Sequence, residues 1–120
     1  MSVEGMWAVY FGDFGGQQVN SGVAVMETGR VFGGDSMMAY LGSYQVNGGK
    51  LTGEIKVWAF NPHQVVTTAF GKLGTPEGSM VRLEGDFDGS GNEITGLLWE
   101  TDSPQLKIPA KLVKVAELPN

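Results

Sequence analysis

Few side chains of the kind that perform catalysis occur in this chain. The single histidine, His63, lies beside Asn61 and Pro62 in an expected loop, and cysteine is absent. The absence of cysteine excludes disulfides, thiolate chemistry and zinc–thiolate sites. No Gly-x-Ser-x-Gly elbow is present, so no serine nucleophile is indicated for His63 to activate. We therefore expect a protein that is not an enzyme.

Acidic and glycine-rich segments are the next candidates for chemistry. The run from Asp86 to Gly91 is similar to the opening of a calcium-binding loop, but its twelfth position is Leu97, where a bidentate glutamate is needed. A hairpin turn rich in Asp and Gly accounts for this run more simply. The glycine-rich segments 12–16 and 71–74 lack the spacing of phosphate-binding loops and open no expected helix. The sequence therefore predicts no metal site and no cofactor.

Apolar and aromatic side chains are the candidates for ligand binding. Leu51, Ile55 and Val57 fall on one face of an expected strand, which would point inward. Trp7 and Trp99, if they also point inward, would either fill the interior or line a pocket for an apolar ligand. These five residues are the candidate lumen site.

Two further aromatic residues alternate onto the opposite face of the same expected strand. Trp58 and Phe60 would point outward, away from the face that holds Leu51. Outward aromatic side chains are typical of protein interfaces. We expect Trp58 and Phe60 to form a homodimer or partner surface.

The frequency of glycine decides the fold class that must position these residues. The 120 residues include 19 glycines and 5 prolines. The longest run free of both is Ala110–Leu118, whereas a mean helix is about 11–12 residues long. An internal glycine costs a helix about 1 kcal/mol and a proline about 3 kcal/mol. A mostly helical fold is therefore excluded, as is a parallel sheet with helical crossovers, and the length suits one domain over residues 1–120.

Short apolar or alternating runs between turns predict antiparallel strands. The expected strands are Gly5–Phe11, Val19–Glu27, Arg30–Phe32, Met37–Val46, Leu51–Phe60, Val65–Gly71, Ser79–Phe87, Glu93–Glu100 and Leu106–Glu117. The connections are short, so neighbours in sequence should pair with each other. About eight such strands close most simply into an up-and-down all-β barrel, which leaves no exposed edge. A short helix is the alternative for the last segment, where we expect an edge or closing strand.

Charge and hydropathy narrow the range of partners. The formal net charge is −5 and the isoelectric point is about 4.7, so direct binding to the phosphates of nucleic acids is disfavoured. No apolar run approaches the roughly 20 residues that a membrane helix needs. The first residues show no basic segment followed by an apolar one, as a signal peptide would. We expect a cytoplasmic protein that contacts neither membrane nor nucleic acid.

A glycine-rich stretch resembles a known family. The segment Gly22–Asp35, read GVAVMETGRVFGGD, is followed by Tyr40 and Gly42 and resembles the signature of the GrlR-like family. This family comprises small bacterial negative regulators of type III secretion, and Gly5–Phe11 is similar to it as well. The match covers about the first third of the chain. The residues that carry the structural motif are Gly33, Gly34, Asp35, Tyr40 and Gly42.

The resemblance implies a fold and a mode of action. It implies an eight-stranded lipocalin-like barrel that forms a homodimer, lacks enzymatic activity and binds a helix-turn-helix transcription activator to keep it from DNA. The family's activator contact is an acidic loop just after the Tyr-x-Gly, and the corresponding segment here, Gln45–Lys50, contains no acidic residue. Two functions stay open. The chain is either a regulator that acts by protein contact or a carrier or sensor of a small apolar ligand.

One structural prediction concerns the corner between two expected strands. Gly33–Asp35 and the pair Met37 and Met38 should form this corner. Aspartate side chains commonly accept hydrogen bonds from backbone N–H groups two or three residues further along the chain. We therefore expect Asp35 to cap the turn.

Overall fold

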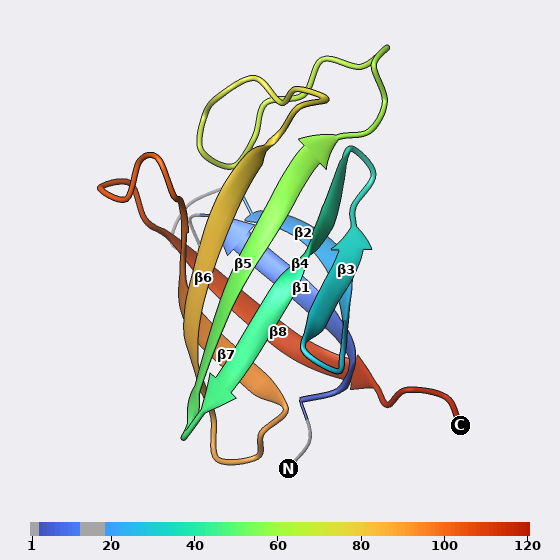
Figure 1. Cartoon of the computed structure of the whole chain (residues 1–120), viewed down its shortest axis with the longest axis vertical. Coiled ribbons are helices and arrows are strands. Elements are labelled where there is room, and N and C mark those ends of the chain that lie inside the picture. Colours follow the sequence, from blue (N-terminus) through green and yellow to red (C-terminus); the bar gives the residue numbers. More distant parts are fainter. Residues whose placement is uncertain (1–2, 13–18) are drawn as a thin grey trace.

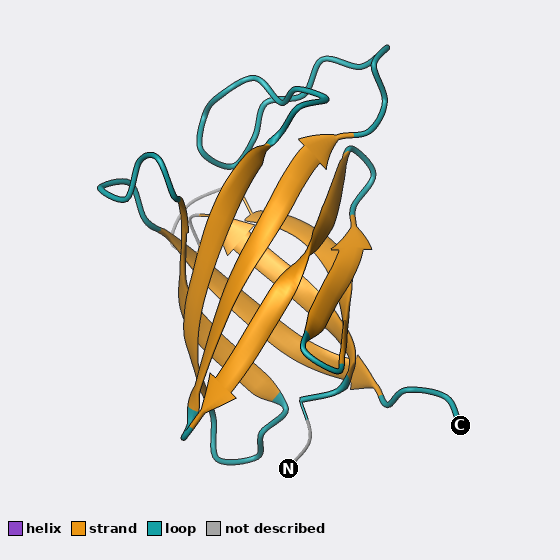
Figure 2. Cartoon of the chain, viewed as in Figure 1, coloured by secondary structure: helices purple, strands orange, loops and turns teal. Residues whose placement is uncertain are grey.

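Eight antiparallel strands form one closed barrel in the order of the sequence (Figures 1 and 2). The computed structural model describes residues 3–12 and 19–120. The strands are β1 (Gly5–Gly12), β2 (Val19–Glu27), β3 (Arg30–Gly34), β4 (Met38–Asn47), β5 (Lys50–Ala59), β6 (Ser79–Phe87), β7 (Glu93–Glu100) and β8 (Ile108–Ala116). Each strand pairs with its neighbours in sequence, and β8 closes the barrel against β1. The all-β, lipocalin-like up-and-down barrel predicted from the sequence is confirmed.

Side chains alternate between the inside and the outside of the barrel along each strand. The buried core consists of Trp7, Ala24, Met26, Val31, Leu51, Leu83, Ile94, Ala110 and Leu112. Trp7, which is 0% exposed, lies near the first residues of β1. Its Nε1 donates a hydrogen bond to the carbonyl oxygen of Val3 at 2.9 Å. Full burial of an apolar side chain of this size contributes about 2–3 kcal/mol to the free energy of folding. Trp7 is therefore a major source of stability at this end of the barrel.

Two glycines on the inner face allow neighbouring strands to approach closely as the barrel coils. A Cβ atom at Gly96 would lie 1.9 Å from the carbonyl oxygen of Glu84. A Cβ atom at Gly42 would lie 2.1 Å from the carbonyl oxygen of Glu54. Both obstacles are backbone atoms, which cannot rotate away as a side chain can. Glycine at these positions therefore permits the tight curvature that a small barrel requires.

Two segments test the strand predictions most sharply. The expected strand at Val65–Gly71 is wrong, because this segment folds back on itself within the long β5–β6 connection. There Thr68 N donates to Lys72 O at 2.7 Å, and Gly74 N donates to Val66 O at 2.8 Å. A closed barrel also leaves no free edge that a ninth strand could join. The C-terminal segment does form a strand, as predicted, and it is the one that closes the barrel.

The β5–β6 connection lies across one end of the barrel, at the top of Figure 1. Its return is fixed where the amide of Ala59 donates to the carbonyl oxygen of Thr75 at 2.9 Å. Lys72 Nζ also lies 3.2 Å from Oε1 of Glu100, a carboxylate at the end of β7 that is only 6% exposed. The loop is thus held against the barrel by a backbone bond and an ion pair. None of the described residues lies in a helix long and apolar enough to cross a bilayer.

Candidate functional site

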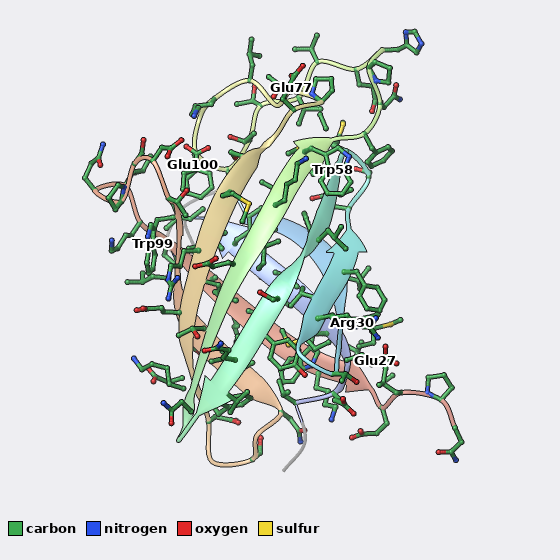
Figure 3. The ribbon with its side chains drawn as sticks, in the orientation of Figure 1. Glu27, Arg30, Trp58, Glu77, Trp99 and Glu100 are labelled. Atoms are coloured by element: carbon green, nitrogen blue, oxygen red, sulfur yellow. The ribbon has the colours of Figure 1, made fainter. Side chains whose placement is uncertain are left out.

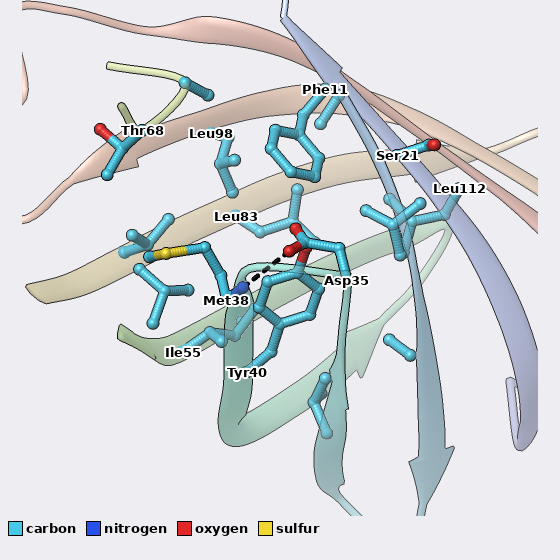
Figure 4. A pocket seen from close by; sticks show the side chains of 18 of the residues that line it. Phe11, Ser21, Asp35, Met38, Tyr40, Ile55, Thr68, Leu83, Leu98 and Leu112 are labelled. Carbon is cyan, nitrogen blue, oxygen red and sulfur yellow. Dashed lines mark hydrogen bonds between the residues drawn. The ribbon is translucent and has the colours of Figure 1, made fainter. Parts of the chain in front are cut away.

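A cavity of about 220 Å³ occupies the interior of the barrel at the end that the β5–β6 loop covers. Most of its wall is apolar and comes from strands on every side, as Figure 4 shows for Phe11, Met38, Ile55, Leu83, Leu98 and Leu112. The buried Val66 lies in the loop and contributes to the wall as well. Seven of the nine core residues border this cavity, and Trp7 and Ile94 are the two core residues that lie outside its wall.

The alternation on β5 predicted part of this wall correctly. Leu51, Ile55 and Val57 all line the cavity. Trp7 points inward too, but it is part of the packed core and lies outside the cavity wall. Of the two readings for Trp7, the structure therefore bears out packing.

The prediction that Trp99 lies in the lumen is wrong. On β7 the inward positions are those of Ile94, which is fully buried, and Leu98, which lines the cavity. Trp99 follows Leu98 directly, so it points outward, as Figure 3 shows. There the ring packs against Lys107, whose Nζ lies 4.2 Å from the ring centroid. Outside the barrel this tryptophan has a cation–π partner in place of an apolar one.

Asp35 caps the corner between β3 and β4, as the sequence predicted. Its Oδ1 accepts hydrogen bonds from the backbone N–H groups of Met37 at 2.8 Å and Met38 at 2.7 Å. Its backbone amide donates to the carbonyl oxygen of Met38 at 3.0 Å. Its Oδ2 accepts a hydrogen bond from the hydroxyl of Tyr40. The same carboxylate therefore closes the turn and holds a tyrosine inside the barrel (Figure 4).

The side chain of Tyr40 fits a space formed by Phe11, Gly22 and Asp35. Its ring meets that of Phe11 edge to face, with centroids 6.5 Å apart. A Cβ atom at Gly22 would lie 2.8 Å from its hydroxyl, so glycine on β2 makes room for the phenol. Burial, with a smaller effect from the hydrogen bond to Asp35, raises the pKa of the Tyr40 hydroxyl far above its usual range. Tyr40 therefore stays protonated at neutral pH and donates to Asp35.

Asp35 gives the lumen a charge that the sequence reasoning missed. Asp35 and Tyr40 both line the cavity, and Asp35 is the only charged residue among the described lining residues. The described ion pairs do not include Asp35. The sequence signal was present, because Tyr40 stands at an inward position of its strand and Asp35 is the nearest carboxylate upstream of it.

The outer surface carries an apolar band that is wider than the predicted Trp58 and Phe60 pair. Strand register places one row of outward residues side by side from Ala8 on β1 to Trp58 on β5. A second row beside it runs from Met6 to Leu41 on β4 and ends at Lys56 on β5. The residues of this outer apolar band are Met6, Ala8, Val23, Val25, Phe32, Ala39, Leu41 and Trp58. Leu41 is 55% exposed, and Phe60, just beyond β5, is 51% exposed. The sequence reasoning found only the edge of this surface.

The remaining sequence candidates lie elsewhere. His63 is exposed in the β5–β6 loop, where its amide donates to Asn61 Oδ1 at 3.0 Å, and it does not line the cavity. Asp88 accepts bonds from Ser90 Oγ and from the amide of Gly91, at 2.9 Å each, so this run forms a turn. These side-chain and backbone hydrogen bonds lower the pKa of the Asp88 carboxyl. Within residues 3–12 and 19–120, no three or more metal-ligating side chains gather.

No protein-family profile matches the chain, and no curated protein matches it in sequence. The function must therefore be argued from the cavity and the surface themselves.

Proposed function

We propose that this protein is a non-enzymatic carrier or sensor that binds one small apolar ligand inside the barrel. The observation that supports it is the cavity of about 220 Å³, which has mostly apolar walls and lies under the β5–β6 loop. Ligand sites are typically concave and apolar, with a few polar groups that fix orientation. A barrel that needed only stability would gain from filling this volume with side chains, because cavities are costly.

The size of the cavity sets the size of the ligand. An apolar cavity of about 150 Å³ in another protein stays dry and binds benzene. By proportion, a cavity of about 220 Å³ suits a ligand of about nine non-hydrogen atoms. At about 0.6 kcal/mol per atom, such a ligand would bind with a Kd on the order of 100 µM. Propylbenzene, which has the required size and no polar group, is a suitable probe.

Filling the cavity should remove this binding. Ala110 is buried on the inner face of β8 and lines the cavity, so Ala110→Leu would place three more carbon atoms inside. We expect propylbenzene to bind the wild type in a calorimetric titration and to bind Ala110→Leu at least tenfold more weakly. The matched control is Thr95→Leu, which introduces the same side chain at an exposed position of β7. Equal binding to wild type and Ala110→Leu, or none to either, would rule out the lumen as the site.

A second candidate function is protein contact by a homodimer, which the outer apolar band favours. Monomeric proteins rarely expose contiguous apolar surfaces of this kind, which are typical of interaction sites. None of the band residues is acidic, and the two carboxylates in the next outward row, Glu27 and Glu54, each form an ion pair with an arginine. Two copies of a chain with net charge −5 can therefore meet there with little repulsion. We propose a second copy of the chain as the occupant, in a two-fold contact that uses the same band on both copies.

A charge placed in the centre of the band should separate the two copies. Phe32 lies between Val25 and Leu41 in the register, so Phe32→Glu would bring two carboxylates together across a two-fold contact. We expect light scattering to give a dimer for the wild type and a monomer for Phe32→Glu. Leu97→Glu, on the outside of β7 and away from the band, should remain a dimer. A monomeric wild type would contradict the proposal. If Phe60→Glu is a monomer while Phe32→Glu remains a dimer, the interface lies at the Trp58 and Phe60 pair instead.

The GrlR-like resemblance implies contact with a transcription regulator. Like the homodimer, this would be a function carried out through protein contact rather than through a ligand in the lumen. The β4–β5 turn takes the place of the family's acidic loop, and its Lys50 lies 3.7 Å from Asp86. Residues 45–50 themselves carry no acidic side chain, so a basic DNA-binding partner would have to use another surface. Recovery of a helix-turn-helix protein with the tagged chain would support this role. A cytoplasmic location stays a prediction.

A further inference from the structure

We infer that the lumen selects ligands whose apolar body carries one amine group, and that Asp35 holds this group. The inference rests on the proposed lumen function and names the class of ligand. It follows from the position of a single carboxylate in an otherwise uncharged wall. The other described residues that line the lumen are uncharged, and most of them are apolar.

The hydrogen bonds of Asp35 come from neutral groups, so they bring no positive charge to its carboxylate. Oδ1 accepts from two backbone N–H groups, and Oδ2 accepts from the Tyr40 hydroxyl. A carboxylate offers about four acceptor positions, so these three donors leave room for one more. All three donors are neutral groups, and no described ion pair supplies a cation. A ligand that brings both a donor and a positive charge would complete the site.

The surroundings strengthen this preference. Asp35 is partly buried, and the Phe11 and Tyr40 rings pack together beside it. Hydrogen bonds between a cation and a carboxylate are roughly twice as strong as those between neutral groups, and weak solvation increases the difference. A ligand carboxylate would meet a like charge in the same space and would be repelled. The lumen should therefore discriminate by charge as well as by size.

The cavity volume and the amine requirement together define a probe. 2-Phenylethylamine has an apolar ring and a protonated amine within the expected size of about nine non-hydrogen atoms. 2-Phenylethanol and propylbenzene have nearly the same shape, with a neutral hydroxyl or a methyl group in place of the amine. Phenylacetate places a negative charge at the same end. Because the four molecules have similar shapes and differ in the charge at one end, differences in their affinities report the effect of charge.

The test is a calorimetric titration of the wild-type protein with each of the four probes. We expect 2-phenylethylamine to bind about tenfold more tightly than 2-phenylethanol and propylbenzene, and phenylacetate to show no binding. If the neutral probes bind as tightly as the amine, the amine preference is wrong while the lumen function stands. If none of the four binds, both are wrong.

A variant then assigns the preference to Asp35. Asp35→Asn keeps an acceptor oxygen at the corner and removes the charge, so the amine should lose its tenfold advantage over the alcohol. Asp86→Asn removes a charge from the exposed outer face of β6 and should leave the advantage unchanged. If Asp35→Asn does not fold, Tyr40→Phe serves instead, because it retains the carboxylate and removes one of its donors. The amine advantage should then be equal or larger, and its loss would contradict the assignment.

Discussion

Replacing Gly96 by alanine is expected to prevent the barrel from closing. The added Cβ atom would lie 1.9 Å from the carbonyl oxygen of Glu84 and 2.5 Å from the Cα atom of Gly85. Both atoms belong to the backbone of the paired strand, so β6 and β7 would have to separate. We expect a loss of more than about 4 kcal/mol, which is most of the stability of a typical small domain. Urea unfolding followed by circular dichroism measures it.

Gly49 provides the matched control for this substitution. A Cβ atom at Gly49 would meet no atom within 4 Å, because the residue lies in the exposed turn between β4 and β5. Gly49→Ala should therefore change the free energy of unfolding by less than about 0.5 kcal/mol. If Gly96→Ala unfolds at the same urea concentration as Gly49→Ala, close strand contact is not what requires glycine here.

Asp35→Ala should have the second largest effect on stability. It removes the acceptor for the amides of Met37 and Met38 and for the hydroxyl of Tyr40, and it leaves these donors unpaired in a half-buried corner. Hydrogen bonds to a charged group contribute about 1.5–3 kcal/mol each, though not additively, so we expect a loss of about 3 kcal/mol. For a domain of this size, that lowers the Tm by about 12 °C.

Thermal unfolding by circular dichroism tests this expectation. Asp102→Ala is the control, because Asp102 is an exposed aspartate in the β7–β8 loop. Its Tm should stay within about 2 °C of the wild type, since exposed substitutions away from such contacts have small effects. Asp35→Asn should fall between the two variants. A wild-type Tm for Asp35→Ala would show that the corner does not depend on its carboxylate.

Local signals were sufficient for most strands. The expected bounds Val19–Glu27, Ser79–Phe87 and Glu93–Glu100 agree with β2, β6 and β7. Each of these runs lies between turns, and turn residues interrupt a chain whatever the rest of the fold does. The alternation of Leu51, Ile55 and Val57 also gave the correct inner face of β5. These properties depend on neighbours in sequence, so sequence could supply them.

Two errors came from properties that depend on distant residues. Val65–Gly71 has the composition of a strand, but pairing needs a free edge, and the closed barrel provides none. Leu97, Leu98 and Trp99 are apolar at three successive positions, so alternation cannot tell which of them points inward. The register of β7 with β6 decides it, and this register places Leu98 beside the inward Leu83. Trp99 is directed outward as a result.

The cavity could not be predicted from any one strand. Whether a barrel of this size is filled or hollow depends on the summed volume of inward side chains from all its strands. Small residues such as Ala110 and Gly53 leave space only because no large side chain opposite fills it. The role of Asp35 at the corner was visible locally. Its place in the lumen depends on the inward position of Tyr40 on the next strand.

The most direct test of the lumen function is to locate a bound ligand by NMR. With propylbenzene at saturating concentration, we predict intermolecular NOEs from its ring to the methyl groups of Ile55, Leu83 and Leu98, which line the cavity. Leu97, on the outer face of β7, and Leu106, in the β7–β8 loop, are exposed and should show none. NOEs confined to the outer methyl groups, or no NOEs at all, would contradict a ligand site inside this barrel.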